Sequence, residues 1–208
     1  MNVDKKFIVG ITGLVKSGKT TVAEYLKKHG FYVINVDKFA HSLYKKNTLL
    51  YKKLIKIFGR SILKTDLNID RKKLSSIAFS SRSIYNKFCS LVYPSLNYEL
   101  EKKIKNSKND VIIIDMAVLF ESGFYKKTDY IVFVNISRKN WLKRIKNHSN
   151  SGFIKKAFIY QNVIKISKKI ALSNYIIYNN GSKKELYNQT VLMSEKIKEI
   201  LWTKKMKN

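Results

Sequence analysis

Residues 13–20 carry the pattern with the clearest chemistry in this chain. They read GLVKSGKT, a full match to G-x-x-x-x-G-K-[ST], between an apolar run and an amphipathic stretch. In such a loop the backbone wraps around phosphates, Lys19 reaches the terminal phosphates and the Thr20 hydroxyl is offered to Mg²⁺. The pattern predicts a nucleoside triphosphate site. Its expected nucleotide-binding residues are Gly13, Leu14, Val15, Lys16, Ser17, Gly18, Lys19, Thr20 and Thr21.

The sequence lacks the further motifs of other nucleotide-binding classes. No aspartate has glycine three positions on, and N-K-x-D does not occur, which argues against a GTPase. A helicase or large ATPase would carry an acidic cluster at a strand end, where this chain has the single Asp115. The remaining class is a small phosphotransferase.

Three charged residues outside the loop are candidates for its chemistry. Asp37 follows the second predicted strand, where it can orient the acceptor hydroxyl or take its proton, although it can equally cap a helix. Asp115 ends the third strand and can hold Mg²⁺ through water, or it is a plain strand-end carboxylate. Arg144 can stabilise charge on the transferred phosphoryl group, or it lies on a solvated helix face.

The elements that must position these residues alternate along the chain. Continuous apolar runs predict strands buried on both faces at 7–12, 32–36, 111–115, 130–135 and 175–178. Helical spacing predicts helices at 20–29, 38–46, 49–58, 70–78, 95–106, 138–145, 158–172 and 183–201. Such alternation is typical of an α/β fold with a five-stranded parallel sheet and helices on both faces.

Composition bounds the remaining function classes. The 208 residues carry a net charge of +28, but Lys outnumbers Arg by 37 to 5, and residues with AT-rich codons make up about half of the chain. We interpret the charge mainly as compositional drift, and a nucleic-acid-binding P-loop protein stays the second functional class. The single Cys89 forms no internal disulfide, and no apolar run approaches a membrane span or a signal peptide, so we expect a cytoplasmic protein.

A series of motifs in the chain resembles the dephospho-CoA kinase family. The series is IVGITGLVKSGKTTVAEYLKKHGFYVINVD, FAH, IDRKKLSSIAF, LVYP, IIIDMAVLFESG and IIYNNG, in family order over residues 7–183. The resemblance implies a P-loop kinase fold and ATP-dependent phosphorylation of the ribose 3′-hydroxyl of dephospho-CoA, with Mg²⁺, to give CoA and ADP. A nucleoside or nucleotide monophosphate kinase is the alternative within enzymes, because it shares the fold and the P-loop.

The resemblance also implies acceptor-site residues and subdomains. Besides Asp37, it implies as substrate residues His41, Asp70, Arg71 and Glu121. Each has an alternative role. His41 can pack or cap, Asp70 and Arg71 can start an exposed helix, and Glu121 can be a surface carboxylate. It divides the single domain into a core (1–36, 108–145 and 173–208), a helical substrate-binding insertion (37–107) and a lid region (146–172), whose polar part at 146–157 predicts a mobile segment. We expect a monomer or weak homo-oligomer that binds dephospho-CoA, no specific nucleic acid and no membrane.

The chain departs from the family pattern at several positions. Leu14 and Lys16 replace loop glycines, and Asn35 replaces the first acid of Asp-x-Asp, so only Asp37 remains. His148 stands where the lid usually has arginine. Tyr93, Ala117 and Tyr178 are further substitutions within family motifs.

Overall fold

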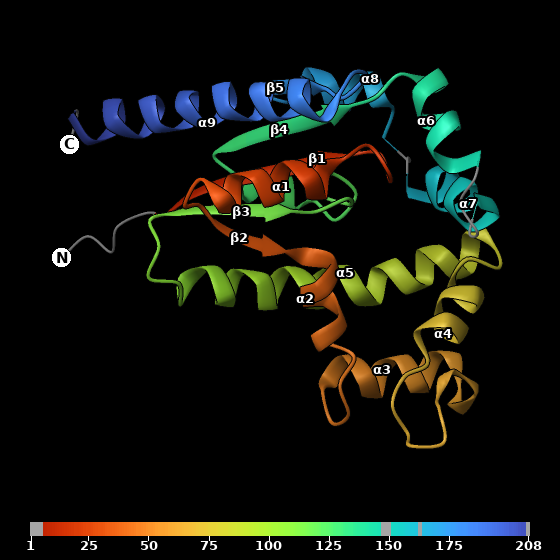
Figure 1. The fold of residues 1–208 in the computed structure, drawn as a ribbon. Helices are drawn as coiled ribbons and strands as arrows, with labels where there is room; N and C mark the ends of the chain where they lie inside the picture. Colours follow the sequence, from red (N-terminus) through yellow and green to blue (C-terminus); the bar gives the residue numbers. More distant parts are fainter. Residues whose placement is uncertain (1–5, 147–150, 162–163, 207–208) are drawn as a thin grey trace.

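The computed structural model describes residues 6–146, 151–161 and 164–206, and within them five strands form one parallel sheet (Figure 1). The strands are β1 (Phe7–Gly13), β2 (Tyr32–Asn35), β3 (Val111–Asp115), β4 (Tyr130–Asn135) and β5 (Tyr175–Tyr178). Their order in space is β2-β3-β1-β4-β5, with β1 at the centre. The predicted sheet is confirmed, with β2 ending one residue earlier than expected.

The strand register brings the polar strand ends to one edge of the sheet. Asn35 of β2 lies opposite Asp115 of β3, which in turn lies opposite Ile11 of β1. Gly13 pairs with Val134 of β4. Because the strands are parallel, the residues that follow them meet at this edge, which is where open α/β sheets bind their ligands.

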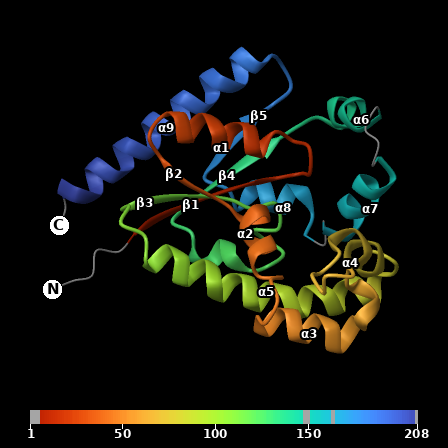
Figure 2. The same cartoon turned by 60° about the horizontal axis from the view of Figure 1, so that its bottom comes forward.

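Helices cover both faces of the sheet, as the sequence predicts (Figures 1 and 2). On one face α1 (Lys19–Lys28) and α9 (Lys183–Met206) pack in a core cluster that includes Val22, Leu26 and Met193. On the other face α5 (Arg82–Lys105) and α8 (Ile166–Ala171) cover a second cluster. Strands buried on both faces explain the continuous apolar runs of the sequence.

A helical insertion lies between β2 and β3. It contains α2 (Val36–Ser42), α3 (Leu49–Phe58), α4 (Arg71–Ala78) and the long α5, with a 3₁₀ turn at Arg60–Ile62. Figure 2 shows α2, α3 and α4 beside α5, with α2 next to the end of β2. The insertion has its own apolar cluster, which consists of Leu50, Leu54, Ile62, Ile69, Leu74 and Val92.

The helix predicted at 95–106 is wrong in its start, because α5 begins at Arg82 and runs through Pro94. A proline inside a helix costs about 3 kcal/mol. The buried side chains continue at helical spacing on both sides of Pro94, and burial of each large one contributes roughly 1.5–3 kcal/mol, which outweighs that cost. These side chains are Tyr85, Cys89, Val92, Leu96, Leu100 and Ile104.

The segment after Arg144 also differs from its prediction. α6 (Arg138–Lys146) agrees, but residues 151–161, partly expected as a polar loop, form α7 (Ser151–Gln161). The helix predicted at 158–172 is therefore two helices, α7 and α8, with Ile154 and Ala157 buried on the inner side of α7. Gly152 lies in the first turn of α7, where it marks no loop. His148 lies outside the described residues.

The C-terminal helix is longer than predicted. α9 continues to Met206, five residues beyond the predicted end at residue 201. None of the described helices is long and apolar enough to cross a bilayer.

Candidate active site

The glycines of the P-loop are required by close contacts. Gly13 ends β1 at φ 149°, and a Cβ there would clash with the Val134 carbonyl oxygen and lie 2.9 Å from Ser17 Oγ. Gly18 precedes α1 at φ 102°, and a Cβ there would clash with the Asn179 side-chain amide. A side chain at either position would therefore displace the loop that the motif predicts.

Two buried polar side chains of the loop, Ser17 and Lys19, suit a phosphate. The Ser17 hydroxyl is buried and has no hydrogen-bond partner among the described residues. Lys19 is buried too, and its Nζ donates to the Leu14 carbonyl oxygen at 3.1 Å. Burial lowers the pKa of Lys19, and the nearby Asp115 carboxylate opposes this shift. A triphosphate would supply the hydroxyl with an acceptor and the amine with a counter-charge, so these residues fit ATP.

Thr20, Asp115 and Asn35 form one hydrogen-bonded group at the ends of β2 and β3. Asp115 Oδ2 accepts from Thr20 Oγ1 at 2.9 Å and from Asn35 Nδ2 at 3.0 Å. Burial raises the pKa of Asp115, while Lys19 and these hydrogen bonds oppose the rise. A hydroxyl and a carboxylate are the oxygen ligands that Mg²⁺ prefers, so the donor set fits this ion.

Asp37 does not cap a helix, which was the alternative role that the sequence left open. The N-cap of α2 is Asn35, whose Oδ1 accepts from the Lys38 backbone N–H at 2.9 Å, so the prediction of a cap at Asp37 is wrong. Asp37 lies in the first turn of α2 and is exposed. In the part of the chain that the structure describes, no donor holds its carboxylate, which faces the cavity described next.

A cavity of about 470 Å³ opens beside the P-loop and joins three of the predicted substrate residues. Val15 of the loop lines it, together with Asp37, His41 and Arg71. His41 Nδ1 lies 2.6 Å from Arg71 Nη1, and burial and this guanidinium lower the pKa of His41. The ring nitrogen next to Arg71 must accept, because a guanidinium only donates. We call this cavity the acceptor cleft.

Asp70 is not part of the acceptor cleft. It is the N-cap of α4, and its Oδ1 accepts from the backbone N–H groups of Lys72 and Lys73 at 2.9 and 3.1 Å. These hydrogen bonds, that from Lys73 first, lower the pKa of Asp70. The helix-start interpretation therefore accounts for Asp70, whereas Arg71 reaches the cleft.

Glu121 is buried, so its interpretation as a surface carboxylate is wrong. Its Oε1 forms an ion pair with Lys169 of α8, and both side chains are nearly inaccessible. Its Oε2 accepts no hydrogen bond from the described residues. Burial raises the pKa of Glu121, and Lys169 opposes the rise. A second cavity of about 490 Å³ beside Glu121 shares Tyr85 and Tyr93 with the acceptor cleft.

Arg144 contacts the backbone of the P-loop. Its Nη1 lies 3.3 and 3.2 Å from the carbonyl oxygens of Lys16 and Ser17, and its Nη2 lies 3.0 and 3.1 Å from the carbonyl and side-chain oxygens of Asn179. Burial lowers the pKa of Arg144. The side chain predicted to meet the phosphoryl group thus holds the backbone of the loop that binds it.

Sequence reasoning missed two residues that hold the P-loop. Asn179 is buried, and its Nδ2 donates to the Ser17 carbonyl oxygen at 2.6 Å. Trp141 Nε1 donates to the Val15 carbonyl oxygen at 2.8 Å. The only signal in the sequence was the position of Asn179 after the fifth strand, inside a family motif.

The structure accounts for one of the two P-loop departures. Leu14 is buried and packs with Ile136, Trp141, Ile145 and Ile154, so an apolar side chain fills the space beneath α6 and α7. Lys16 adopts φ 65°, a left-handed conformation that glycine takes without strain.

Fold and site together define a P-loop phosphotransferase, which moves a phosphoryl group from a nucleoside triphosphate to a small acceptor. The triphosphate loop follows the central strand, and the acceptor cleft lies between it and the helical insertion.

Comparison with known proteins narrows this class. The family model for dephospho-CoA kinase matches residues 7–185. The dephospho-CoA kinase of Aquifex aeolicus is 32% identical over 91% of this chain and 96% of its own, and that of Fusobacterium nucleatum is 33% identical over 91% and 98%. The chain belongs to the dephospho-CoA kinase family, whose reaction is the ATP-dependent final step of coenzyme A synthesis.

Solved structures agree on the fold. TT1252 from Thermus thermophilus has a TM-score of 0.73 at 19% identity and covers 91% of this chain and 97% of its own. Dephospho-CoA kinase from Campylobacter jejuni has a TM-score of 0.66 at 24% identity, covering 91% and 96%. A shikimate kinase from Bacteroides thetaiotaomicron reaches 0.54 at 14% identity, covering 92% and 98%, so the fold extends to other small-molecule kinases. The family match does not favour the nucleotide monophosphate kinase alternative.

Proposed function

We propose that this chain transfers the γ-phosphoryl group of Mg-ATP to the ribose 3′-hydroxyl of dephospho-CoA, with Asp37 as the residue that orients this hydroxyl and takes its proton. The observation that carries the proposal is the acceptor cleft, which joins Asp37, His41 and Arg71 to the P-loop residue Val15. A carboxylate without a protein partner at this position is free to accept a hydrogen bond from an incoming hydroxyl.

Gly13 to Thr21 would hold the triphosphate through backbone N–H groups, the Ser17 hydroxyl and the Lys19 amine. Thr20 and, through water, Asp115 would hold Mg²⁺, which neutralises charge on the phosphates when bound. Lys19 must leave the Leu14 carbonyl oxygen to reach the phosphates. Since this is the one hydrogen bond that the buried amine makes to the described residues, its exchange for a charged phosphate is favourable.

Arg144 would act first as a positioning residue. Both terminal nitrogens already donate to the P-loop backbone and to Asn179, which fixes the loop for phosphate binding. A direct contact between Arg144 and the transferred phosphoryl group stays a prediction.

The cavity beside Glu121 would extend the acceptor site. Dephospho-CoA has a long pantetheine arm with amide N–H groups, and the unpartnered Oε2 of Glu121 is an acceptor for such a group. His41 and Arg71 would bind phosphate oxygens of the acceptor nearer the P-loop, because both can donate there. Asp70 would act only by holding the start of α4.

The subdomain boundaries stay part of the proposal: a substrate-binding insertion at 37–107 and a lid at 146–172. The close contact of Arg82 with the end of α7 supports their joint action, because its guanidinium donates to the Tyr160 carbonyl oxygen at 2.7 Å and its central carbon lies over the Tyr160 ring, 4.9 Å from the centroid. A cytoplasmic location, a monomer or weak homo-oligomer and the absence of specific nucleic-acid binding stay predictions.

An ADP-release assay with dephospho-CoA, AMP, CMP and pantetheine phosphate as acceptors tests the substrate. We expect dephospho-CoA to have the highest kcat/KM, and equal use of AMP would contradict the proposal.

Lys19→Ala and Asp37→Asn should each lower kcat about 100-fold or more, because each removes a group that acts in the transition state. The matched controls Lys28→Ala and Asp110→Asn change exposed residues away from the cleft and should keep full activity. An Asp37→Asn enzyme with near-normal kcat would remove the proton-acceptor role.

A further inference from the structure

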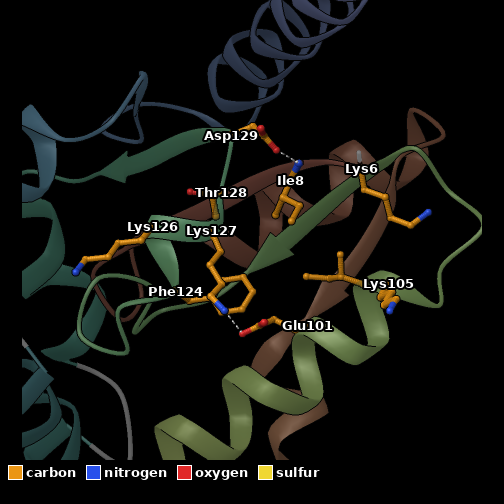
Figure 3. Close-up of a pocket in the computed structure, with 10 residues that line it drawn as sticks. Lys6, Ile8, Glu101, Lys105, Phe124, Lys126, Lys127, Thr128 and Asp129 are labelled. Carbon is orange, nitrogen blue, oxygen red and sulfur yellow. Dashed lines mark hydrogen bonds and ion pairs between the residues drawn. The ribbon is translucent and has the colours of Figure 1, made fainter. Parts of the chain in front are cut away.

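A cavity of about 580 Å³ lies at the edge of the sheet opposite the P-loop (Figure 3). Ile8 near the start of β1 and Asp129 just before β4 line it, together with Ile104 of α5 and Phe124 of the 3₁₀ turn Phe124–Lys127. The P-loop follows the other end of β1, about 20 Å away at the usual rise of a strand. The cavity is therefore separate from the acceptor cleft and the nucleotide loop.

The floor of the cavity is apolar. Phe124 and Ile104 close the bottom of the hollow and are almost fully buried, and of these three side chains the half-buried Ile8 exposes the most apolar surface. Figure 3 shows Ile8 and Phe124 between the surrounding charged side chains. The volume is within the range of small-molecule sites, which are roughly 300–1,000 Å³ and mostly apolar.

The rim is net positive, because its four lysines, Lys6, Lys105, Lys126 and Lys127, outnumber its two carboxylates, Glu101 and Asp129. Of the two carboxylates, Glu101 forms an ion pair with Lys127 at 2.6 Å, and Asp129 Oδ2 accepts from the Ile8 backbone N–H at 2.9 Å. Lys6, Lys105 and Lys126 complete the rim. Among the described residues, no carboxylate lies within ion-pair distance of the Lys105 or Lys126 ammonium group.

Lysines are spread over this whole protein, so charge alone identifies no site. This rim differs because it surrounds an apolar hollow large enough for a ligand. A neutral ligand would leave the rim charges unused, and an inorganic anion would gain nothing from the apolar floor.

We propose that this cavity binds a small amphipathic organic anion. Its apolar chain or ring lies on Ile8, Ile104 and Phe124, and its carboxylate, sulfonate or phosphate group accepts from Lys105 and Lys126. Burial of the apolar part supplies affinity, and the charge-assisted hydrogen bonds select an anion.

Octanoate is the test probe, with 1-octanol as the uncharged control and inorganic phosphate as the control without an apolar part. We expect octanoate to shift the amide NMR signals of Ile8, Phe124 and Thr128 with a Kd of about 1 mM or below. Octanol and phosphate should each bind about tenfold more weakly or worse. The absence of shifts at these three amides up to about 10 mM octanoate overturns the proposal. Equal binding of octanol also overturns it.

The double substitution Lys105→Glu with Lys126→Glu should weaken octanoate binding about tenfold or more, because it reverses both charges at the head group. Lys52→Glu with Lys56→Glu on α3 is the matched control, since these exposed lysines change the net charge equally without lining the cavity. Equal loss of octanoate binding in both variants would mean unspecific attraction, which contradicts a built site.

Octanoate should bind equally well with saturating ATP and dephospho-CoA, and both variants should keep normal kcat. Displacement of octanoate by either substrate would assign the binding to the active site and overturn the proposal.

Discussion

Replacement of Asn35 by aspartate tests the hydrogen-bonded group at the ends of β2 and β3. The sequence pattern predicts that this substitution changes kcat only slightly, because it restores the acid of the family pattern. The structure adds a prediction for stability, since Asn35 Nδ2 donates to Asp115 Oδ2 at 3.0 Å. In Asn35→Asp a carboxylate oxygen replaces the donor, and two negative charges face each other.

Two energies bound the expected loss of stability: the repulsion between the two carboxylates and the cost of protonating one of them. Two unit charges at 3 Å repel by about 5 kcal/mol at an effective dielectric constant near 20. Protonation of one carboxylate relieves the repulsion and costs at most about 4 kcal/mol at pH 7 for a pKa near 4. It costs less here, because burial already raises the pKa of Asp115. We therefore expect Asn35→Asp to lower the free energy of unfolding by about 2–4 kcal/mol at pH 7.

The pH dependence has a definite sign. The paired carboxylates raise the pKa of one acid in the folded state above its unfolded value of about 3.9, so the folded variant binds the proton more tightly. The variant's free energy of unfolding should therefore fall furthest below that of wild type at neutral pH, and the difference should shrink as the pH falls through the raised pKa towards about 4.

Mg²⁺ should restore more stability to the variant than to wild type if Asp115 binds the ion as proposed.

Urea denaturation followed by tryptophan fluorescence at neutral and acidic pH measures these differences. The cap of α2 is not disturbed, because aspartate caps about as well as asparagine. Asn188→Asp, an exposed position on α9, controls for the added charge. A change of less than about 0.5 kcal/mol at pH 7 would refute the reasoning, because it would mean that the two side chains are not held together.

Three further predictions concern the P-loop and the insertion. Lys16→Gly should raise the free energy of unfolding by about 0.5–1 kcal/mol in urea denaturation, because glycine adopts φ 65° without strain; a loss of stability would contradict this. Arg82→Gln should increase hydrogen exchange at the end of α7, since it removes the donors to the Ile159 and Tyr160 carbonyl oxygens, and unchanged exchange would mean that these bonds do not hold α7. Asp70→Asn keeps the cap of α4, but asparagine cannot ionise. Because the folded protein lowers the pKa of Asp70, the ionised carboxylate stabilises the folded state at pH values above the unfolded pKa of Asp70. This contribution is lost as the pH falls through the folded pKa. The advantage of wild type over this variant should therefore disappear in acid, and an advantage independent of pH would refute the charge contribution.

The sequence by itself determined the sheet and the nucleotide loop. Strands buried on both faces are continuous apolar runs, and the P-loop depends on short-range spacing of Gly13, Gly18, Lys19 and Thr20, so both can be recognised locally. The motif series also predicted the family, which the comparisons confirm. Asp37 and Asp115 were found because parallel strands deliver their following residues to one edge.

Only the tertiary structure decided how distant segments combine. Helix α5 crosses Pro94 because burial of its apolar face outweighs a local penalty, and α7 forms from residues with loop-like polarity because its inner side packs on Leu14 and Trp141. The partners of charged side chains also come from distant parts of the chain. Glu121 pairs with Lys169, and Arg144 holds the backbone of Ser17, although nothing in the sequence near either residue indicates the partner. Such contacts depend on which faces of the chain meet after folding, and local spacing carries no information about that meeting.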